Sequence, residues 1–158
     1  MGTVEISEFL TARLKEDETA AKDAACEASS IAVSDDEGGL ARWRAMDGGE
    51  GITTESAYAG AAFLVAPMGY LEERVAEHVA RHDPARVLAD IAAKRAVVEH
   101  FKVAAEYAQT VDKSQVGVAE AWRVTSIWTQ LLHVVKLLAA PYADHPDFRP
   151  DWKVEADD

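Results

Sequence analysis

The chain has 158 residues, close to the roughly 150 of a typical single domain, so we expect one domain over residues 1–158. Its 28 acidic and 16 basic side chains give a net charge of −12, while 49% of the residues are apolar. This composition supports a buried core and excludes wholesale disorder. The acidity also argues against general nucleic-acid binding, which needs an excess of cations to displace counterions from phosphates.

The compartment is inferred from three features of the sequence. The opening residues carry acids where a signal peptide would carry bases and an apolar run. The most apolar stretch, Trp128 to Ala140, is interrupted by polar residues and falls short of the roughly 20 residues that span a bilayer. A single cysteine, Cys26, cannot form an internal disulfide, which fits a reducing compartment. We therefore expect a cytoplasmic protein without a membrane segment.

Apolar residues recur at helical spacing in four stretches, which predicts helices near residues 4–29, 70–81, 84–110 and 116–139. Thr3 is predicted to cap the first helix. Asp83-Pro84 marks the start of the third, because Asp is a good N-cap and Pro is tolerated at the first helical position. The fourth helix is apolar on nearly every side towards its end, which predicts that it is the central helix. Its predicted core residues are Trp128, Leu131, Val135 and Leu138.

Turn-forming Gly and Asp residues dominate positions 34–51, which we interpret as a loop region. Within it, partial alternation over residues 40–46 indicates a short strand that could pair with residues 61–66, although an apolar run of this kind could equally be helical. Residues 141–158 are predicted to form an extended acidic tail that packs on the body through Phe148 and Trp152. The fold class is therefore mainly α, or α+β at most, with four helices in a compact domain and a small β-hairpin between residues 40 and 66.

Three blocks of sequence resemble a family of small uncharacterised proteins from actinobacteria and their phages. The blocks are Phe9 to Glu18, Glu77 to Leu88 followed by Ala93-Lys94-Arg95, and Leu137 to Arg149. The family has no assigned activity, so the resemblance implies a biological context and no mechanism. Many members carry cysteines between the two later blocks, where this chain has none, so a metal role suggested by those members does not carry over.

Two sets of residues in the second block could bind a ligand. His78, His82 and Asp83, completed by His100 or His133 from neighbouring helices, have the residue types of a divalent-metal site. The simpler interpretation is that Asp83 caps the helix at Pro84 and that the histidines are partly buried and hydrogen-bonded.

The second set is basic. Arg81, Arg86 and Lys94 lie in a locally basic segment around the helix that begins at Pro84, whose first-turn N–H groups could bind a small anion. The alternative is that pairs of opposite charge four residues apart, such as Asp90 and Lys94, account for these charges on an exposed helix face.

No glycine-rich phosphate loop, serine nucleophile elbow or Cys-His motif occurs in the sequence. We therefore predict a non-enzymatic protein-interaction module without a cofactor, such as a phage accessory or host-interaction factor. Its acidity favours a basic protein partner, including a DNA-binding protein recognised by mimicry of DNA charge. The competing hypothesis is a metal-dependent hydrolase that uses the His78, His82 and Asp83 cluster.

Overall fold

The protein is mainly α-helical with a minor β component, as the sequence predicts. The computed structural model describes residues 2–31, 42–46, 51–55, 64–67, 73–111 and 116–154. Its internal contacts group into two compact units, one made of Met1–Glu16 with Ala92–Asp158 and the other of Asp17–Ile91. None of the helices in these described ranges is long and apolar enough to span a bilayer.

The unit Asp17–Ile91 contains a three-stranded antiparallel sheet and the helix α2 (Glu73–Arg81). The strands are β1 (Arg42–Ala45), β2 (Gly51–Glu55) and β3 (Leu64–Pro67), in the order β1-β2-β3. Trp43 and Ala45 pack from β1 onto a small core of Ile52, Ala76 and Ala80. This core fixes the sheet on α2.

The predicted direct pairing of residues 40–46 with residues 61–66 is wrong. Trp43 of β1 pairs with Thr54 of β2, and β3 pairs with the other edge of β2. The β-branched run Ile52-Thr53-Thr54 favours a strand. The sequence prediction missed this strand because Gly51 directly precedes the run, and glycine is typical of turns. Part of the expected loop over 34–51 is therefore strand, and its residues 34–41 and 47–50 lie outside the described part of the chain.

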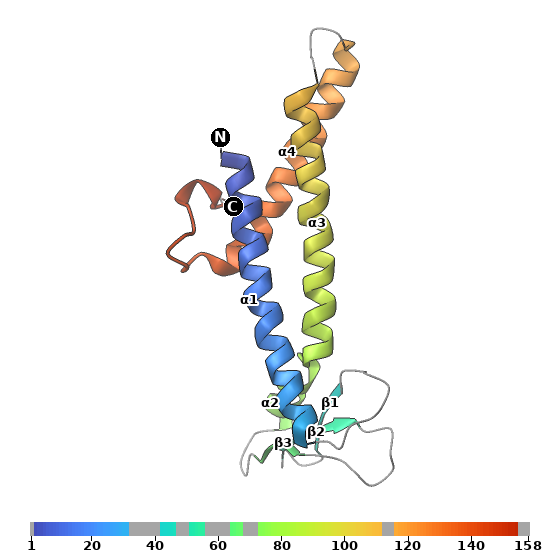
Figure 1. Cartoon of the computed structure of the whole chain (residues 1–158), viewed down its shortest axis with the longest axis vertical. Helices are drawn as coiled ribbons and strands as arrows, with labels where there is room; N and C mark the ends of the chain where they lie inside the picture. The colour runs from blue at the N-terminus through green and yellow to red at the C-terminus, as the bar shows by residue number, and fades with distance from the viewer. Residues whose placement is uncertain are drawn as a thin grey trace. The chain divides into compact units, whose positions relative to one another are not determined.

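The other unit is built from the start of α1 (Gly2–Ile31), the end of α3 (Pro84–Thr110) and α4 (Val118–Ala139). In Figure 1, α3 and α4 run side by side in opposite directions. Each helix contributes apolar side chains to the core of this unit. The buried ones are Ile6, Phe9, Leu10, Leu14, Val98, Phe101, Ala105, Val124, Val135 and Ala139.

Aromatic contacts fasten the C-terminal segment of this unit to α1. Tyr142 and Trp152 end the 3₁₀ turns Ala140–Tyr142 and Pro150–Trp152, and Phe148 lies between these turns. The rings of all three lie against Phe9, with centroids 6.2, 6.0 and 5.1 Å away for Tyr142, Phe148 and Trp152. Trp152 is only 3% exposed. Burial of large aromatic rings is a strong apolar contribution to stability, so this segment belongs to the core of its unit.

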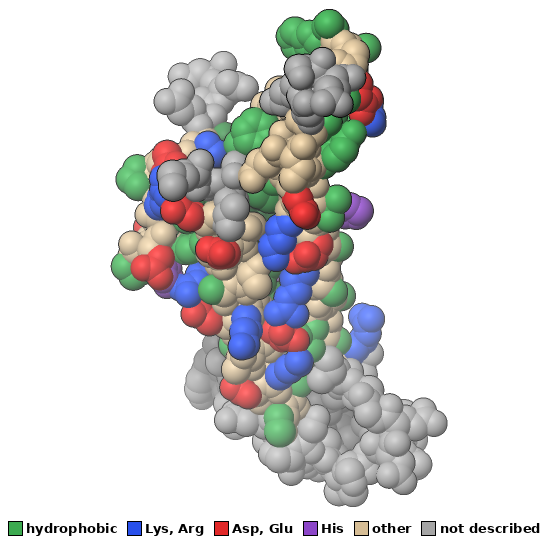
Figure 2. All heavy atoms as spheres, turned by 45° about the horizontal axis from the view of Figure 1, so that its top comes forward, with side chains coloured by type: hydrophobic (Ala, Val, Ile, Leu, Met, Phe, Trp, Pro, Cys, Tyr) green, Lys and Arg blue, Asp and Glu red, His purple; other side chains and the backbone are tan. Residues whose placement is uncertain are grey.

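Two details of the helices differ from the sequence predictions. Thr3 lies inside α1, which begins at Gly2, and not at the position before the helix that the sequence predicted. Of the predicted core of α4, Val135 is fully buried, whereas Trp128, Leu131 and Leu138 are half-buried. The reason is that α4 packs along one side and leaves large apolar side chains exposed on others. Apolar side chains are accordingly visible over the α3 and α4 end, at the top of Figure 2.

Candidate anion-binding cleft

Asp83 joins the sheet to the start of α3. Its Oδ1 accepts the backbone N–H of Arg86 at 2.7 Å, which is the bond of a helix N-cap, and its Oδ2 accepts the backbone N–H of Trp43 at 3.4 Å. The side chain is 5% exposed. Burial of a carboxylate is costly unless its oxygens accept hydrogen bonds, and here each oxygen accepts one. The predicted capping role is therefore confirmed.

The strand β1 presents two arginines beside this junction. Because side chains alternate across a strand, the inward packing of Trp43 and Ala45 puts Arg42 and Arg44 together on the opposite, exposed side. Residues two apart on a strand have Cα atoms about 6.6–6.8 Å apart, so the two side chains leave the strand as neighbours on one side.

A cleft of about 780 Å³ lies between β1 and the junction of α2 with α3. Four arginines line it, Arg42 and Arg44 from β1, Arg81 from the end of α2 and Arg86 from the first turn of α3. Its other charged residues are Glu77 and Asp83, and Trp43 and small alanines complete the lining. All four arginines are solvent-exposed. The cleft is thus locally cationic in a chain of net charge −12.

The arginines of the cleft have few partners among the residues that the structure describes. Arg86 donates from Nη1 to the backbone oxygen of Arg81 at 3.3 Å, which brings two guanidinium-bearing residues together at the helix junction. Within the described ranges, none of the four forms an ion pair with a carboxylate of the chain. Guanidinium groups bind carboxylates and phosphates through paired N–H···O bonds, so an unpaired cluster is suited to an external anion.

The structure brings together part of the predicted anion site. Arg81 and Arg86 line the cleft, whereas Lys94 lies two turns further along α3 and does not line it. The predicted anion position at the N–H groups of the first turn is partly taken, because Asp83 already accepts the N–H of Arg86. Sequence reasoning missed Arg42 and Arg44, although their alternate positions in a predicted strand were a usable signal.

The predicted metal ligands lie beside the cleft and do not line it, apart from Asp83. The rings of His78 and His82 are 4.6 Å apart by centroid, and Nδ1 of His82 lies 2.9 Å from the backbone oxygen of His78. Both side chains are exposed. No group of three or more His, Cys, Asp and Glu side chains in the described part of the chain is placed to hold a metal ion. The metal site therefore stays a prediction.

The fold and the cleft together define a mainly helical protein with a local cationic site. A model of a family of unknown function, DUF6221, matches residues 3–154, so the chain belongs to that family. No curated protein and no solved structure matches the chain. The expectation of an uncharacterised family is thereby confirmed.

Proposed function

We propose that the chain is a non-enzymatic protein-interaction module, and that the arginine cleft binds a short acidic segment of a protein partner. The observation that carries this proposal is the gathering around one cleft of four arginines, from β1, α2 and α3, none of which forms an ion pair with a carboxylate of the described residues. Exposed arginines on an acidic protein usually pair with the carboxylates around them. Their convergence without such partners in the described part of the chain favours recognition of an anion from outside the chain.

A carboxylate-bearing segment fits the charge of the whole chain better than a nucleic acid does. A nucleic acid extends over many nucleotides, so its phosphates would be repelled by the acidic surface of a chain whose net charge is −12. A short acidic segment would contact mainly the cleft. The overall acidity still favours a partner that is basic elsewhere on its surface, as the composition predicts. The resemblance to actinobacterial and phage proteins makes an accessory or host-interaction role part of the proposal.

The spacing of Arg42 and Arg44 suggests the form of the segment. In an extended peptide, alternate side chains lie on the same side of the backbone. Their spacing along the peptide equals the spacing of Arg42 and Arg44 along β1. Acidic residues at alternate positions would therefore meet Arg42 and Arg44 in register, with Arg81 and Arg86 available to further carboxylates. Backbone addition to β1 is not part of the proposal, because the outward N–H of Trp43 is already bonded to Asp83.

Calorimetric titration of the full chain with a peptide of alternating Glu and Thr tests the proposal. A peptide with Gln in place of Glu is the matched control for the ligand. We expect binding of the acidic peptide only, weakened by added salt because screening acts on exposed charges. Equal affinity for both peptides, or no binding of either at low salt, would contradict the proposal. Competition by inorganic phosphate at low concentration would reassign the cleft to a phosphate group.

A further inference from the structure

The helices α3 and α4 share an exposed apolar face that the cleft does not explain. On α3, Val103 is 66% exposed and Tyr107 is 46% exposed. On α4, Ile127 is 42% and Val134 38% exposed, with the half-buried Leu131 between them. We call these five residues the α3/α4 face. All of them belong to the unit that contains Ala92–Asp158.

A groove runs along this face between the two helices. It has a volume of about 270 Å³ and is lined mostly by apolar side chains, including Val103 and Ala104 from α3 and Ile127 and Leu131 from α4. The groove gives the face a depth into which side chains of another molecule could fit. Complementary ridges and grooves are how helices pack against one another.

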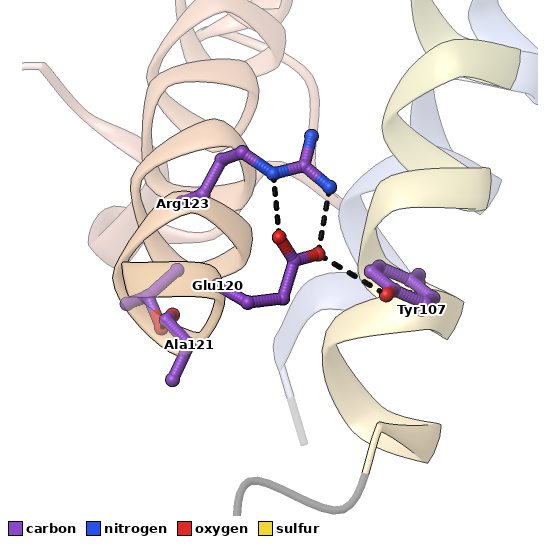
Figure 3. Close-up of polar contacts among 5 residues, drawn as sticks. Tyr107, Glu120, Ala121 and Arg123 are labelled. Carbon is purple, nitrogen blue, oxygen red and sulfur yellow. Dashed lines mark hydrogen bonds and ion pairs between the residues drawn. The ribbon is translucent and has the colours of Figure 1, made fainter. Parts of the chain in front are cut away.

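Two charged side chains at the groove, Glu120 and Arg123, pair with each other, and the exposed His100 also lines the groove. Glu120 accepts two hydrogen bonds from Arg123, at 2.9 and 2.6 Å, and Tyr107 donates to it from α3 at 3.4 Å (Figure 3). The Arg123 hydrogen bonds hold the pKa of the Glu120 carboxyl below its usual range. The charges of Glu120 and Arg123 therefore neutralise each other within the chain. The face has no unbalanced charge from this pair that would attract a strongly charged ligand.

The residue spacing on α4 is that of a helix seam. Val124, Ile127, Leu131 and Val134 follow one another at steps of three, four and three residues, the heptad spacing with which a helix packs against a partner helix. Val124 is buried within the unit, whereas Ile127 and Val134 continue the same seam into solvent. The seam is thus only partly filled by the chain's own helices.

We propose that a second copy of this chain covers the α3/α4 face. The exposed parts of its side chains amount to roughly several hundred Å², the size of the largest apolar patch on a typical monomer, which is often an interaction site. A standard interface buries roughly 800 Å² per partner, so a two-fold pair would have to bury the rim around the face as well. Because the face is uncharged on a chain of −12, a copy of the same apolar face matches it better than a basic or acidic partner. This inference does not depend on the arginine cleft.

Sedimentation equilibrium of the full chain over a range of concentrations tests this inference. We expect a monomer–dimer equilibrium that salt strengthens, because screening reduces the repulsion between two acidic chains. Salt should weaken peptide binding in the cleft but strengthen dimerisation. The two experiments can therefore contradict one proposal without contradicting the other. A chain that stays monomeric at every concentration and salt level would overturn the inference and leave the face to a different protein.

Variants on α4 locate the interface. Ile127→Glu should weaken dimerisation at least about 100-fold, because it buries an unpaired charge in the contact. Val118→Glu is the matched control, since Val118 is 76% exposed and lies on the opposite side of the same helix. It should dimerise like the wild type. Unchanged dimerisation of a folded Ile127→Glu protein would overturn the assignment of the face.

A second variant covers the case in which Ile127→Glu does not fold. In a Cys26→Ser background, Val103→Cys should give a cross-linked dimer with a bifunctional maleimide, because Val103 lies on the α3/α4 face. The same reagent should leave Val118→Cys monomeric. Equal cross-linking at the two positions would overturn the inference as clearly as a monomeric wild type.

Discussion

Asp83 accepts the backbone N–H of Arg86 at 2.7 Å, so the residue that caps α3 also positions the backbone of one of the four arginines of the cleft. The same carboxylate holds β1 through the N–H of Trp43, and β1 carries Arg42 and Arg44. A single buried side chain thus connects helix capping to the geometry of the candidate site. Its substitution should affect both stability and ligand binding.

Replacing Asp83 with alanine should lower the free energy of unfolding by about 0.5–2 kcal/mol, the usual cost of losing an N-cap. Asp83→Asn and Asp83→Ser should recover most of this loss, because both side chains cap helices well. Chemical denaturation of the three variants measures the effect. An Asp83→Ala protein as stable as the wild type would show that the cap contributes nothing.

Loss of cleft arginines should weaken binding of the acidic peptide without unfolding the protein. A charge-assisted hydrogen bond contributes about 1.5–3 kcal/mol, so Arg42→Gln with Arg44→Gln should raise the dissociation constant at least about tenfold. Arg74→Gln is the control, because this exposed arginine on α2 does not line the cleft. Comparable weakening by the control variant would point to net charge alone and against a specific site.

The buried helix core gives a prediction about stability. Leu14 is 1% exposed on α1, so Leu14→Ala should cost about 2–5 kcal/mol through lost burial and the cavity left behind. Leu137, which is 50% exposed on α4, should tolerate alanine with a much smaller loss. Thermal unfolding of the two variants compares them directly. Equal losses would mean that α4 packs differently from the arrangement described above.

The histidines beside the cleft make the hydrolase hypothesis testable. We expect protein purified without chelators to carry well under one equivalent of metal, because no group of three or more possible ligands in the described ranges is placed to hold an ion. Elemental analysis of the purified chain measures this. A stoichiometric metal that disappears in a folded His82→Ala protein would reverse the expectation and make the hydrolase the first hypothesis.

Local signals in the sequence predicted the helices better than the sheet or the site. Asp83-Pro84 defines the start of α3 by itself, because capping and the fixed φ of proline act over neighbouring residues. The pairing of β1 with β2 depends on contacts distant in the chain, as does the meeting of Arg42 with Arg86. The inner face of α4 could not be chosen by periodicity, because apolar residues occupy more than one side and only the positions of α1 and α3 decide between them.

Acid stability should depend on the pairing of Arg149 with Asp151. Arg149 donates from Nε and Nη2 to the two carboxylate oxygens at 3.0 and 3.3 Å, and these bonds hold the pKa of Asp151 below its usual range. Arg149 also pairs with Glu5 of α1, and its guanidinium lies 5.7 Å from the ring of the buried Trp152. The pair therefore lies where the C-terminal segment meets α1.

The sign of the pH effect follows from the direction of that pKa shift. A depressed pKa in the folded state means that the pair contributes stability above the unfolded value, which is about 3.9 for Asp, and that this contribution is lost as the pH falls through the lower folded value. Asp151→Asn should therefore reduce stability slightly at neutral pH and converge with the wild type at strongly acidic pH. Asp144→Asn removes the same charge from an exposed residue and is the control. Denaturation curves from pH 7 to pH 2 test this, and a stability difference between Asp151→Asn and the wild type that grows as the pH falls would show that the assigned direction is wrong.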